Sequence, residues 1–328
     1  MKQIIGAGLA CIDLIYDSEQ LTIQNGGTCS NVLSALSSLG WNSILVKPQY
    51  AGNYEKIMDN AFQTLGMKTV RFKKTKVSTP RIIEKRNQDH VFYTKCPCCG
   101  KKILNLVLPT ENNIKSLNID FSHCDIFFHD RVSSGIKEMV ELANLSGGMA
   151  MYEPNGFRNE QIFSEHCLKC NIIKFSNERI SMDVAERLRT SASKGRIQLI
   201  ICTDSDKGLR FSYRISSTTD EMSSWQTIPP LYFKNVYDTS GAGDWFTAGF
   251  LNEWLNKNEK KSLFQETVIV KSLEKSRTYA RESTAFLGAQ GLLYSKEYMD
   301  RKNRRPLSHT LPKHSPLSSC PCCGEVNC

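Results

Sequence analysis

The segment at residues 238–244, which reads Asp-Thr-Ser-Gly-Ala-Gly-Asp, constrains the fold most, because an apolar run at helical spacing follows it directly. The pattern predicts a loop that opens a helix. Gly241 and Gly243 let the backbone approach a ligand closely, since glycine adopts dihedral angles that other residues avoid. The free N–H groups at such a helix start form an anion site. A carboxylate in the first turn, Asp244, fits a base that takes a proton from a hydroxyl attacking a phosphoryl group.

Short β-prone apolar runs alternate with helical patterns through the middle of the chain. Strands are expected at residues 126–128, 149–152, 172–175 and 199–202, and helices at 135–143 and 182–192. This alternation predicts right-handed βαβ units and a mostly parallel sheet with helices on both faces. Ligands of such sheets bind beyond the carboxyl ends of the strands, so we expect Asn155, Asn177, Thr203 and the Gly241 loop to converge on one cleft.

The glycine-rich segment resembles the C-terminal signature of the ribokinase-like (PfkB-type) carbohydrate kinases, and the similarity extends from about Gln3 to Tyr294. Further segments resemble family motifs in the same order, at residues 6–13, 26–31, 51–53, 152–155, 174–178 and 288–290. The resemblance implies a doubly wound, mostly parallel α/β kinase domain over residues 1–300. It also implies a small β lid, with strands around residues 11–18 and 68–95.

The same resemblance implies an ATP-dependent phosphotransferase that acts on a hydroxyl, expected to be a hydroxymethyl group, of a sugar or nucleoside. Asp244 is then the general base, and the N–H groups of Gly241, Ala242 and Gly243 form the anion hole. The expected substrate-binding residues are Asp13, Gly26, Gly27 and Asn31. The expected nucleotide-binding residues are Asn177, Thr203, Gly208, Thr239, Gly241 and Gly243. Mg²⁺ bridging the phosphates is the expected metal cofactor.

Some positions depart from the family pattern. Cys11 stands where many sugar-specific members carry asparagine, and Cys29 replaces a small residue. Ile180 occupies the place of an acid that organises metal and phosphates, although Glu178 is close, and Ser205 replaces a glycine. An alternative function therefore stays open, in which the chain is a catalytically weak, zinc-stabilised binding or sensor module for a partner or nucleic acid.

Six of the 13 cysteines fall in two similar pentapeptides, Cys-Pro-Cys-Cys-Gly at residues 96–100 and again at residues 320–324. Cysteines three apart in a tight turn direct both sulfurs at one metal, and two such knuckles supply the four thiolates of a closed zinc site. The predicted ligands of structural Zn²⁺ are Cys96, Cys99, Cys320 and Cys323, whereas Cys98 and Cys322 either substitute or stay outside the site. Disulfides or reactive thiols are the alternative. The site, within one chain or across a dimer, would pin the tail at residues 301–328 to an insertion at residues 94–104.

Cys167 and Cys170 form a third spaced pair. His166 and His123 are further residues of a metal-ligand type, but no fourth ligand is evident, so we interpret the pair as structural. Cys11, Cys29, Cys124 and Cys202 lie among apolar residues and are expected in the core.

The 328 residues carry 40% hydrophobic side chains, enough for a large core, and a net charge of +9 that suits an acidic ligand such as ATP. No apolar run is long enough to predict a membrane span, and the N-terminus does not resemble a signal peptide, which favours a cytoplasmic protein. A homodimer through the lid is expected from the resemblance. The basic residues at 301–305 are interpreted as solvated surface, so nucleic acid is an unlikely partner.

Overall fold

A computed structural model describes residues 1–17, 20–86, 90–215, 221–232, 234, 236–256 and 262–308. Its centre is a nine-stranded sheet in the order β13-β12-β11-β10-β9-β8-β1-β4-β5. The strands are β1 (Gln3–Ala7), β4 (Asn42–Ala51), β5 (Lys68–Ser78), β8 (Ile126–His129), β9 (Met149–Tyr152), β10 (Ile172–Ser176), β11 (Leu199–Thr203), β12 (Leu209–Tyr213) and β13 (Gln226–Ile228). All pairs from β11 to β5 are parallel, and only β12 and β13 run antiparallel to their neighbours.

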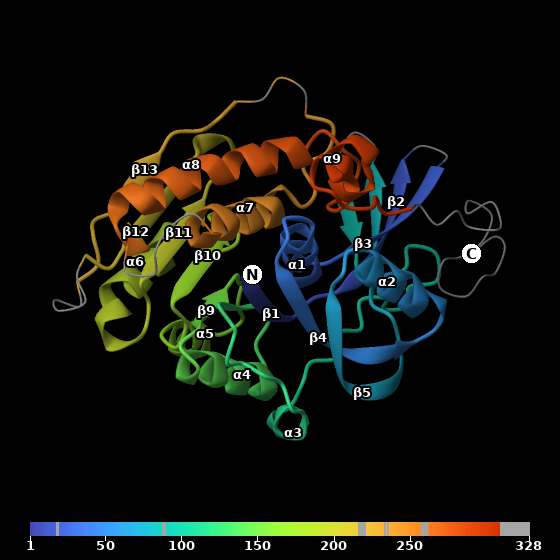
Figure 1. Ribbon diagram of the computed structural model, residues 1–328, viewed down its shortest axis with the longest axis horizontal. Coiled ribbons are helices and arrows are strands. Elements are labelled where there is room, and N and C mark those ends of the chain that lie inside the picture. The colour runs from blue at the N-terminus through green and yellow to red at the C-terminus, as the bar shows by residue number, and fades with distance from the viewer. Residues whose placement is uncertain are drawn as a thin grey trace.

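Helices cover both faces of this sheet (Figure 1). One layer holds α1 (Thr28–Ser38), α7 (Ala242–Asn256) and α8 (Glu266–Ser283), and the other holds α4 (Ser134–Leu145), α5 (Glu160–Cys167) and α6 (Met182–Ser191). The remaining helices are α2 (Asn53–Thr64), α3 (Glu111–Lys115) and α9 (Lys296–Arg301). The predicted doubly wound fold, with strands and helices at the expected places, is therefore confirmed. No helix in these ranges has both the length and the apolar character needed to cross a membrane.

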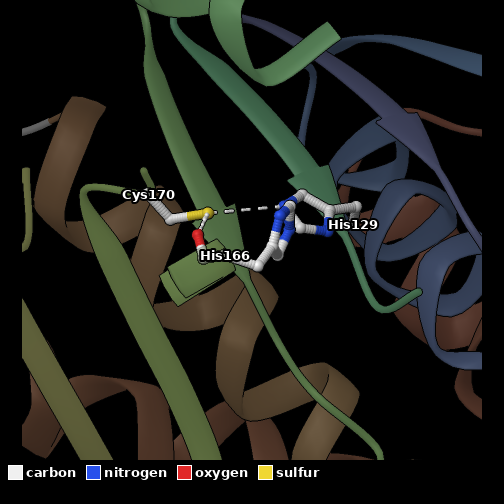
Figure 2. A group of neighbouring side chains, drawn as sticks. All are labelled: His129, His166 and Cys170. Carbon is white, nitrogen blue, oxygen red and sulfur yellow. Dashed lines mark hydrogen bonds between the residues drawn. The ribbon is translucent and has the colours of Figure 1, made fainter. Parts of the chain in front are cut away.

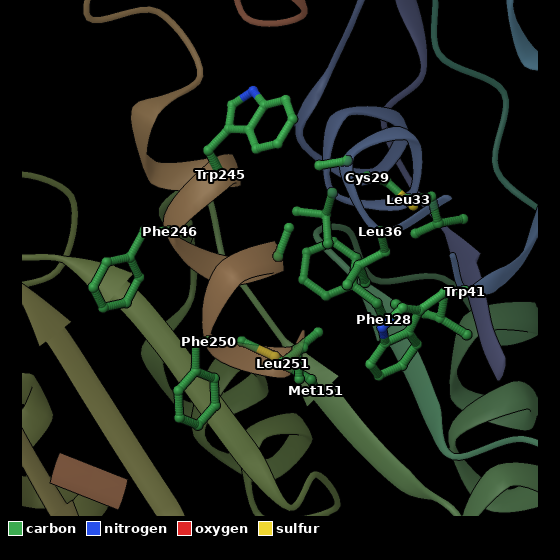
Figure 3. Close-up of a cluster of buried hydrophobic side chains, with 14 of the residues drawn as sticks. Cys29, Leu33, Leu36, Trp41, Phe128, Met151, Trp245, Phe246, Phe250 and Leu251 are labelled. Carbon is green, nitrogen blue, oxygen red and sulfur yellow. The ribbon is translucent and has the colours of Figure 1, made fainter. Parts of the chain in front are cut away.

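Alternate residues of the central strands face two separate cores, because successive side chains of a strand point to opposite faces of the sheet. Phe128 and Met151 face α1 and α7, where Leu33 and Phe250 are fully buried (Figure 3). On the other face Phe127 packs with the apolar side chains of α4, α5 and α6. The expected core cysteines, Cys11, Cys29, Cys124 and Cys202, are all buried.

A second, four-stranded sheet has the order β3-β2-β6-β7 and forms the lid. It consists of β2 (Cys11–Asp17), β3 (Gln20–Gly26), β6 (Arg81–Arg86) and β7 (His90–Tyr93). The predicted lid range of 68–95 is too long, because Lys68–Ser78 pairs in parallel with β4 and forms the edge of the main sheet. Its alternating charged side chains suit an edge strand with one exposed face. The second strand of the lid, β3, was not expected.

Candidate functional site

The glycine-rich loop enters α7 as its sequence predicts, and Asp244 lies in the first turn of the helix. Gly241 has φ of +74°, and a Cβ there would lie 2.5 Å from the Cβ of Ala289, so the position requires glycine. The Ala242 N–H donates to the Thr239 carbonyl at 3.1 Å. A tight turn thus fixes the backbone at the point where the first-turn N–H groups lack acceptors within the helix.

The side chain of Asp238 anchors this loop through hydrogen bonds to the backbone, a role that the sequence analysis missed. Its carboxylate is buried and accepts hydrogen bonds from the N–H of Ser240 at 2.8 Å and of Gly288 at 2.7 Å. The indole of Trp245 donates to the Ala289 carbonyl at 2.9 Å. The loop is therefore tied at two places to residues 288–289. The position of Asp238 at the head of the motif is the signal that identifies it in hindsight.

Asp244 ends a chain of hydrogen bonds that joins three distant segments. The Gln290 amide donates to Asn31 Oδ1 at 3.0 Å, and the Asn31 amide donates to Asp244 Oδ2 at 2.7 Å. The pKa of Asp244 is raised to about 7, mainly by burial and then by the negative charge of Glu153, while the hydrogen bond from Asn31 and the charge of Lys174 oppose the rise. A carboxylate with such a pKa can accept a proton near neutral pH.

Lys174 and Glu153 form a buried ion pair of 2.5 Å beneath the loop, and neither was predicted as a site residue. The Lys174 ammonium also donates to the Gly243 carbonyl at 3.0 Å, and the Thr247 hydroxyl donates to Glu153 at 2.7 Å. Glu153 directly follows β9, whereas Lys174 lies in the middle of β10, and both belong to the motifs at residues 152–155 and 174–178. The place of Glu153 after a strand end was the available signal for that residue.

Asp13 lies on the lid, where β2 passes β3. A Cβ at Gly26 would come within 1.9 Å of the Asp13 carboxylate, so that glycine leaves room for the acid. The pKa of Asp13 is raised to about 7, mainly by burial; the hydrogen bond from the Cys11 thiol opposes the rise, and the charges of Glu84 and Asp238 add to it. Gly27, with φ of +92°, opens α1, and the Asn31 N–H donates to its carbonyl at 2.9 Å. Asp13 and Asn31 thus come from adjoining segments.

The lid contacts both flanks of the glycine-rich loop. The Gln24 amide of β3 donates to the Leu287 carbonyl at 2.9 Å, and the Arg86 guanidinium of β6 donates to the Tyr237 carbonyl at 2.6 Å. The Ser240 hydroxyl donates to the Glu84 carboxylate at 3.2 Å. These contacts bring the lid residues next to the start of α7.

A second group of predicted residues lies at the ends of β10 and β11. The Asn177 N–H donates to the Thr203 carbonyl at 2.8 Å, and Asp204 accepts a 3.4 Å hydrogen bond from the Asn177 amide. Gly208 has φ of +93°, and a Cβ there would lie 2.3 Å from a backbone carbonyl oxygen. The structure therefore brings Asn177, Thr203 and Gly208 together as expected.

Two departures from the family pattern have clear structural effects here. Ser205 adopts φ of +41°, a strained conformation for a residue other than glycine, and its hydroxyl donates to Glu178 at 2.9 Å. Ile180 is buried in the core of this face. The position of the expected acid is thus filled by an apolar side chain, while Glu178 stays at the surface.

The first cysteine knuckle has the turn that its sequence predicts. The Gly100 N–H donates to the Cys96 carbonyl at 2.9 Å, the Cys96 N–H donates to the Lys101 carbonyl at 2.8 Å, and Gly100 has φ of +68°. Cys96 is buried and Cys99 is partly exposed. The other two predicted ligands, Cys320 and Cys323, lie outside the described residues.

Comparison with known proteins agrees with this geometry. Residues 168–284 match the model of the pfkB family carbohydrate kinases. No curated protein sequence matches the chain. The fold is similar to that of a fructokinase with bound ATP from Xylella fastidiosa, with a TM-score of 0.71 and 17% identity over 88% of this chain and 93% of that one. A ribokinase from Giardia lamblia has a TM-score of 0.71 and 14% identity over 92% of this chain and 98% of that one.

An adenosine kinase from Schistosoma mansoni, in complex with 2-fluoroadenosine, is also similar, with a TM-score of 0.68 and 13% identity over 87% of this chain and 96% of that one. The fold is that of the ribokinase-like proteins. The match of residues 168–284 to the pfkB family model agrees with the resemblance inferred from the sequence.

Alanine substitutions at the two glycines of the loop should show which position requires glycine and which tolerates a side chain. We expect Gly241→Ala to lower the free energy of unfolding by about 2–5 kcal/mol, because the left-handed backbone and the contact with Ala289 both oppose a side chain. Gly243→Ala is the matched control: its Cβ would meet only Lys174 Nζ, at 3.5 Å, and the expected change is within about 1 kcal/mol. Urea unfolding measures both, and equal losses would contradict the assignment.

Proposed function

We propose that the chain transfers the terminal phosphoryl group of ATP to a hydroxyl, in particular a hydroxymethyl group, of a sugar or nucleoside. The observation that carries the proposal is the Asn31–Asp244 hydrogen bond of 2.7 Å at the start of α7, beside the glycine-rich loop. It fixes a carboxylate next to a helix start that binds anions. A base and a phosphate site side by side are what transfer to a hydroxyl requires.

In the proposed reaction Asp244 removes the proton from the substrate hydroxyl as the oxygen attacks the γ-phosphorus. The bond from the γ-phosphorus to the bridging oxygen then breaks, and ADP leaves. The backbone N–H groups of residues 241–243 stabilise the charge on the phosphoryl oxygens. The Ala242 N–H does so after it gives up its hydrogen bond to the Thr239 carbonyl. One such donor typically lowers a barrier by about 3–4 kcal/mol.

The residues present fit a nucleotide triphosphate. Gly243 lies in the first turn of α7, where backbone N–H groups lack acceptors within the helix and favour an anion. Asn177, Thr203, Gly208 and the Thr239 backbone form the proposed border for the remaining phosphates and the nucleoside. Mg²⁺ would be held largely by the phosphates themselves and would neutralise their charge, because this ion keeps few protein ligands in such sites.

Asp13 and Asn31 are the proposed contacts for neighbouring substrate hydroxyls, together with the backbone of Gly26 and Gly27. A carboxylate accepts two hydroxyl hydrogens, and an amide both donates and accepts. Ribose, fructose and nucleosides all offer such hydroxyl pairs. The similar structures include a ribokinase, fructokinases and an adenosine kinase, which supports both substrate classes.

The first test is replacement of the base. We expect Asp244→Asn to lower kcat by about 10²–10⁴-fold with ATP, Mg²⁺ and the preferred substrate from a panel of sugars and nucleosides, because an amide cannot take the proton. Asp183→Asn is a matched control, since Asp183 is also an acid in the first turn of a helix, α6, and is exposed. The control should keep full turnover. Substantial turnover in Asp244→Asn would contradict the assigned role.

The pH dependence of kcat/KM provides a second test. Both Asp13 and Asp244 have a pKa of about 7, and each must be ionised, one as a hydroxyl acceptor and one as the base. We therefore expect kcat/KM to fall as the pH drops below about 7, with a slope that approaches two protons. In Asp13→Asn the residual activity should fall with a slope of one proton. A wild-type profile that is flat between about pH 5 and 8 would contradict both assignments.

A catalytically weak binding or sensor module is the second candidate. The buried Ile180 and the strained Ser205 favour it, because both replace residues that the family pattern uses near the phosphates. The two candidate functions predict different results when the protein is assayed with the panel of sugars and nucleosides. Nucleotide binding without stimulated turnover by any sugar or nucleoside would support the module, and turnover lost in Asp244→Asn would support the kinase.

We further propose that Cys96 and Cys99 bind structural Zn²⁺ with Cys320 and Cys323. The tight turn that the Gly100 N–H closes on the Cys96 carbonyl supports a zinc knuckle, because such a turn suits two cysteines three residues apart that share one metal. We expect Cys96→Ser to lose about one zinc equivalent per chain relative to the wild type, measured by elemental analysis of protein purified without added zinc. Cys202→Ser is a control that replaces a buried core cysteine away from the knuckle. Unchanged zinc in Cys96→Ser would contradict the proposal.

A further inference from the structure

Three potential metal ligands meet in the core layer between the sheet and α5, outside the proposed kinase site. His129 ends β8, His166 lies on α5, and Cys170 lies in the turn between α5 and β10. All three are buried, and their ligand atoms lie within 4.8 Å of one another (Figure 2). The sequence analysis considered His166 and His123 beside the cysteine pair, but His123 is exposed, whereas His129, which it did not consider, completes the group.

The spacing between Cys170 and His129 already fits a metal ion. Cys170 Sγ lies 3.6 Å from His129 Nε2. Zinc bonds of about 2.3 Å to sulfur and about 2.0–2.1 Å to nitrogen, at a tetrahedral angle, separate the two ligand atoms by about 3.6 Å. Two imidazoles and a thiolate are also a ligand set that zinc prefers over the hard cations Mg²⁺ and Ca²⁺.

His129 is fixed with its free nitrogen toward the group. Its Nδ1 lies 3.0 Å from the Arg131 carbonyl oxygen, which can only accept, so Nδ1 carries the proton and donates it. The lone pair is then on Nε2, the atom that faces Cys170. A metal-binding histidine whose other nitrogen donates to a carbonyl is the usual arrangement, because the hydrogen bond sets both ring orientation and basicity.

His166 supplies the second, independent observation. It is 2% exposed, and neither Nδ1 nor Nε2 has a hydrogen-bond partner within the ranges that the structure describes. A buried imidazole with both nitrogens unpaired is costly, since it loses its contacts with water without replacement. Tyr152 stacks on His129 with ring centroids 4.7 Å apart and meets the edge of His166 at 5.0 Å, so both imidazoles are held in place. A metal ion would satisfy one of the two unpaired nitrogens of His166.

We propose that His129, His166 and Cys170 bind a structural zinc ion, with Cys167 as the fourth ligand. Cys167 is buried at the end of α5, and a tight turn joins it to Cys170, whose N–H donates to the Cys167 carbonyl at 2.9 Å. Its sulfur lies outside the 4.8 Å group and has to turn toward the ion. Two thiolates neutralise Zn²⁺, which a buried site favours because uncompensated charge there is costly. The two thiol protons are released to solvent on binding.

The ion would brace the sheet edge that carries the kinase site. His129 and Tyr152 are register partners on β8 and β9, and the Glu153 N–H donates to the His129 carbonyl at 2.9 Å. Glu153 is the partner of Lys174 under the glycine-rich loop. The zinc site is thus connected to this ion pair by the backbone hydrogen bond between Glu153 and His129. It touches no proposed substrate or nucleotide contact, so its role is structural.

The test measures zinc by elemental analysis in full-length protein purified without added metal. We expect His166→Phe, which keeps an aromatic ring against Tyr152, and Cys170→Ala each to contain about one equivalent less than the wild type. His123→Asn and Cys202→Ala are matched controls, an exposed histidine and a buried cysteine outside the group, and should keep the wild-type content. Unchanged zinc in both His166→Phe and Cys170→Ala would overturn the proposal.

X-ray absorption spectroscopy at the zinc edge identifies the atoms bound to zinc. It tests the proposal even when the variants fail to fold, because it needs only the wild-type protein. The proposal predicts nitrogen as well as sulfur in the nearest shell, whereas zinc in the cysteine knuckle alone gives only sulfur. A shell of sulfur alone, or the absence of bound zinc, would overturn the proposal. Neither readout depends on turnover, so this site and the kinase function are tested separately.

Discussion

The ion pair of Lys174 and Glu153 is the interaction on which the arrangement of the site depends. It is buried, and it connects two neighbouring central strands, β9 and β10, to the start of α7 through Gly243 and Thr247. Removing one partner of such a pair costs about 3–5 kcal/mol, because the other charge remains uncompensated in the interior. Glu153 also raises the pKa of Asp244, which places the two carboxylates in one electrostatic unit.

Around that pair, the site is assembled from segments that are distant in the sequence. Gln290 orients Asn31, Asn31 orients Asp244, and Asp238 holds the turn that leads to Asp244. Each link uses a buried or partly buried polar group that has found a specific partner, so the loop is fixed before any ligand arrives. Such preorganised donors stabilise charge without having to reorient during a reaction.

The sequence was enough to predict the α/β fold and the glycine-rich loop, because both depend on local patterns. Strand and helix positions follow from hydrophobic periodicity, and Gly241 and Gly243 are marked by their spacing before an apolar helix. The role of Lys174, Glu153 and Gln290 depends on which strand ends and turns meet in space, which periodicity does not reveal. The same limit applies to β5, where charged alternation is equally consistent with a lid strand and with the edge of the main sheet.

The histidine and cysteine group illustrates the same point. Cys167 and Cys170 form a visible motif, but their partner His129 comes from a strand that lies 41 residues before Cys170. Strand pairing between β8 and β9 brings it there. His123, the other histidine considered from the sequence, is at the surface. Which histidine completes the ligand set depends on how the strands pair, and hydrophobic periodicity does not reveal that.

The contacts between the lid and the glycine-rich loop have a thermodynamic consequence. Gln24, Glu84 and Arg86 join the lid to both sides of the loop, while Asp13 on the same lid faces the proposed substrate. A ligand that shifts the lid therefore also shifts the backbone that would receive phosphate. Such coupling is reciprocal. If the bound phosphate acceptor raises the affinity for the phosphate donor by some factor, the bound donor raises the affinity for the acceptor by the same factor.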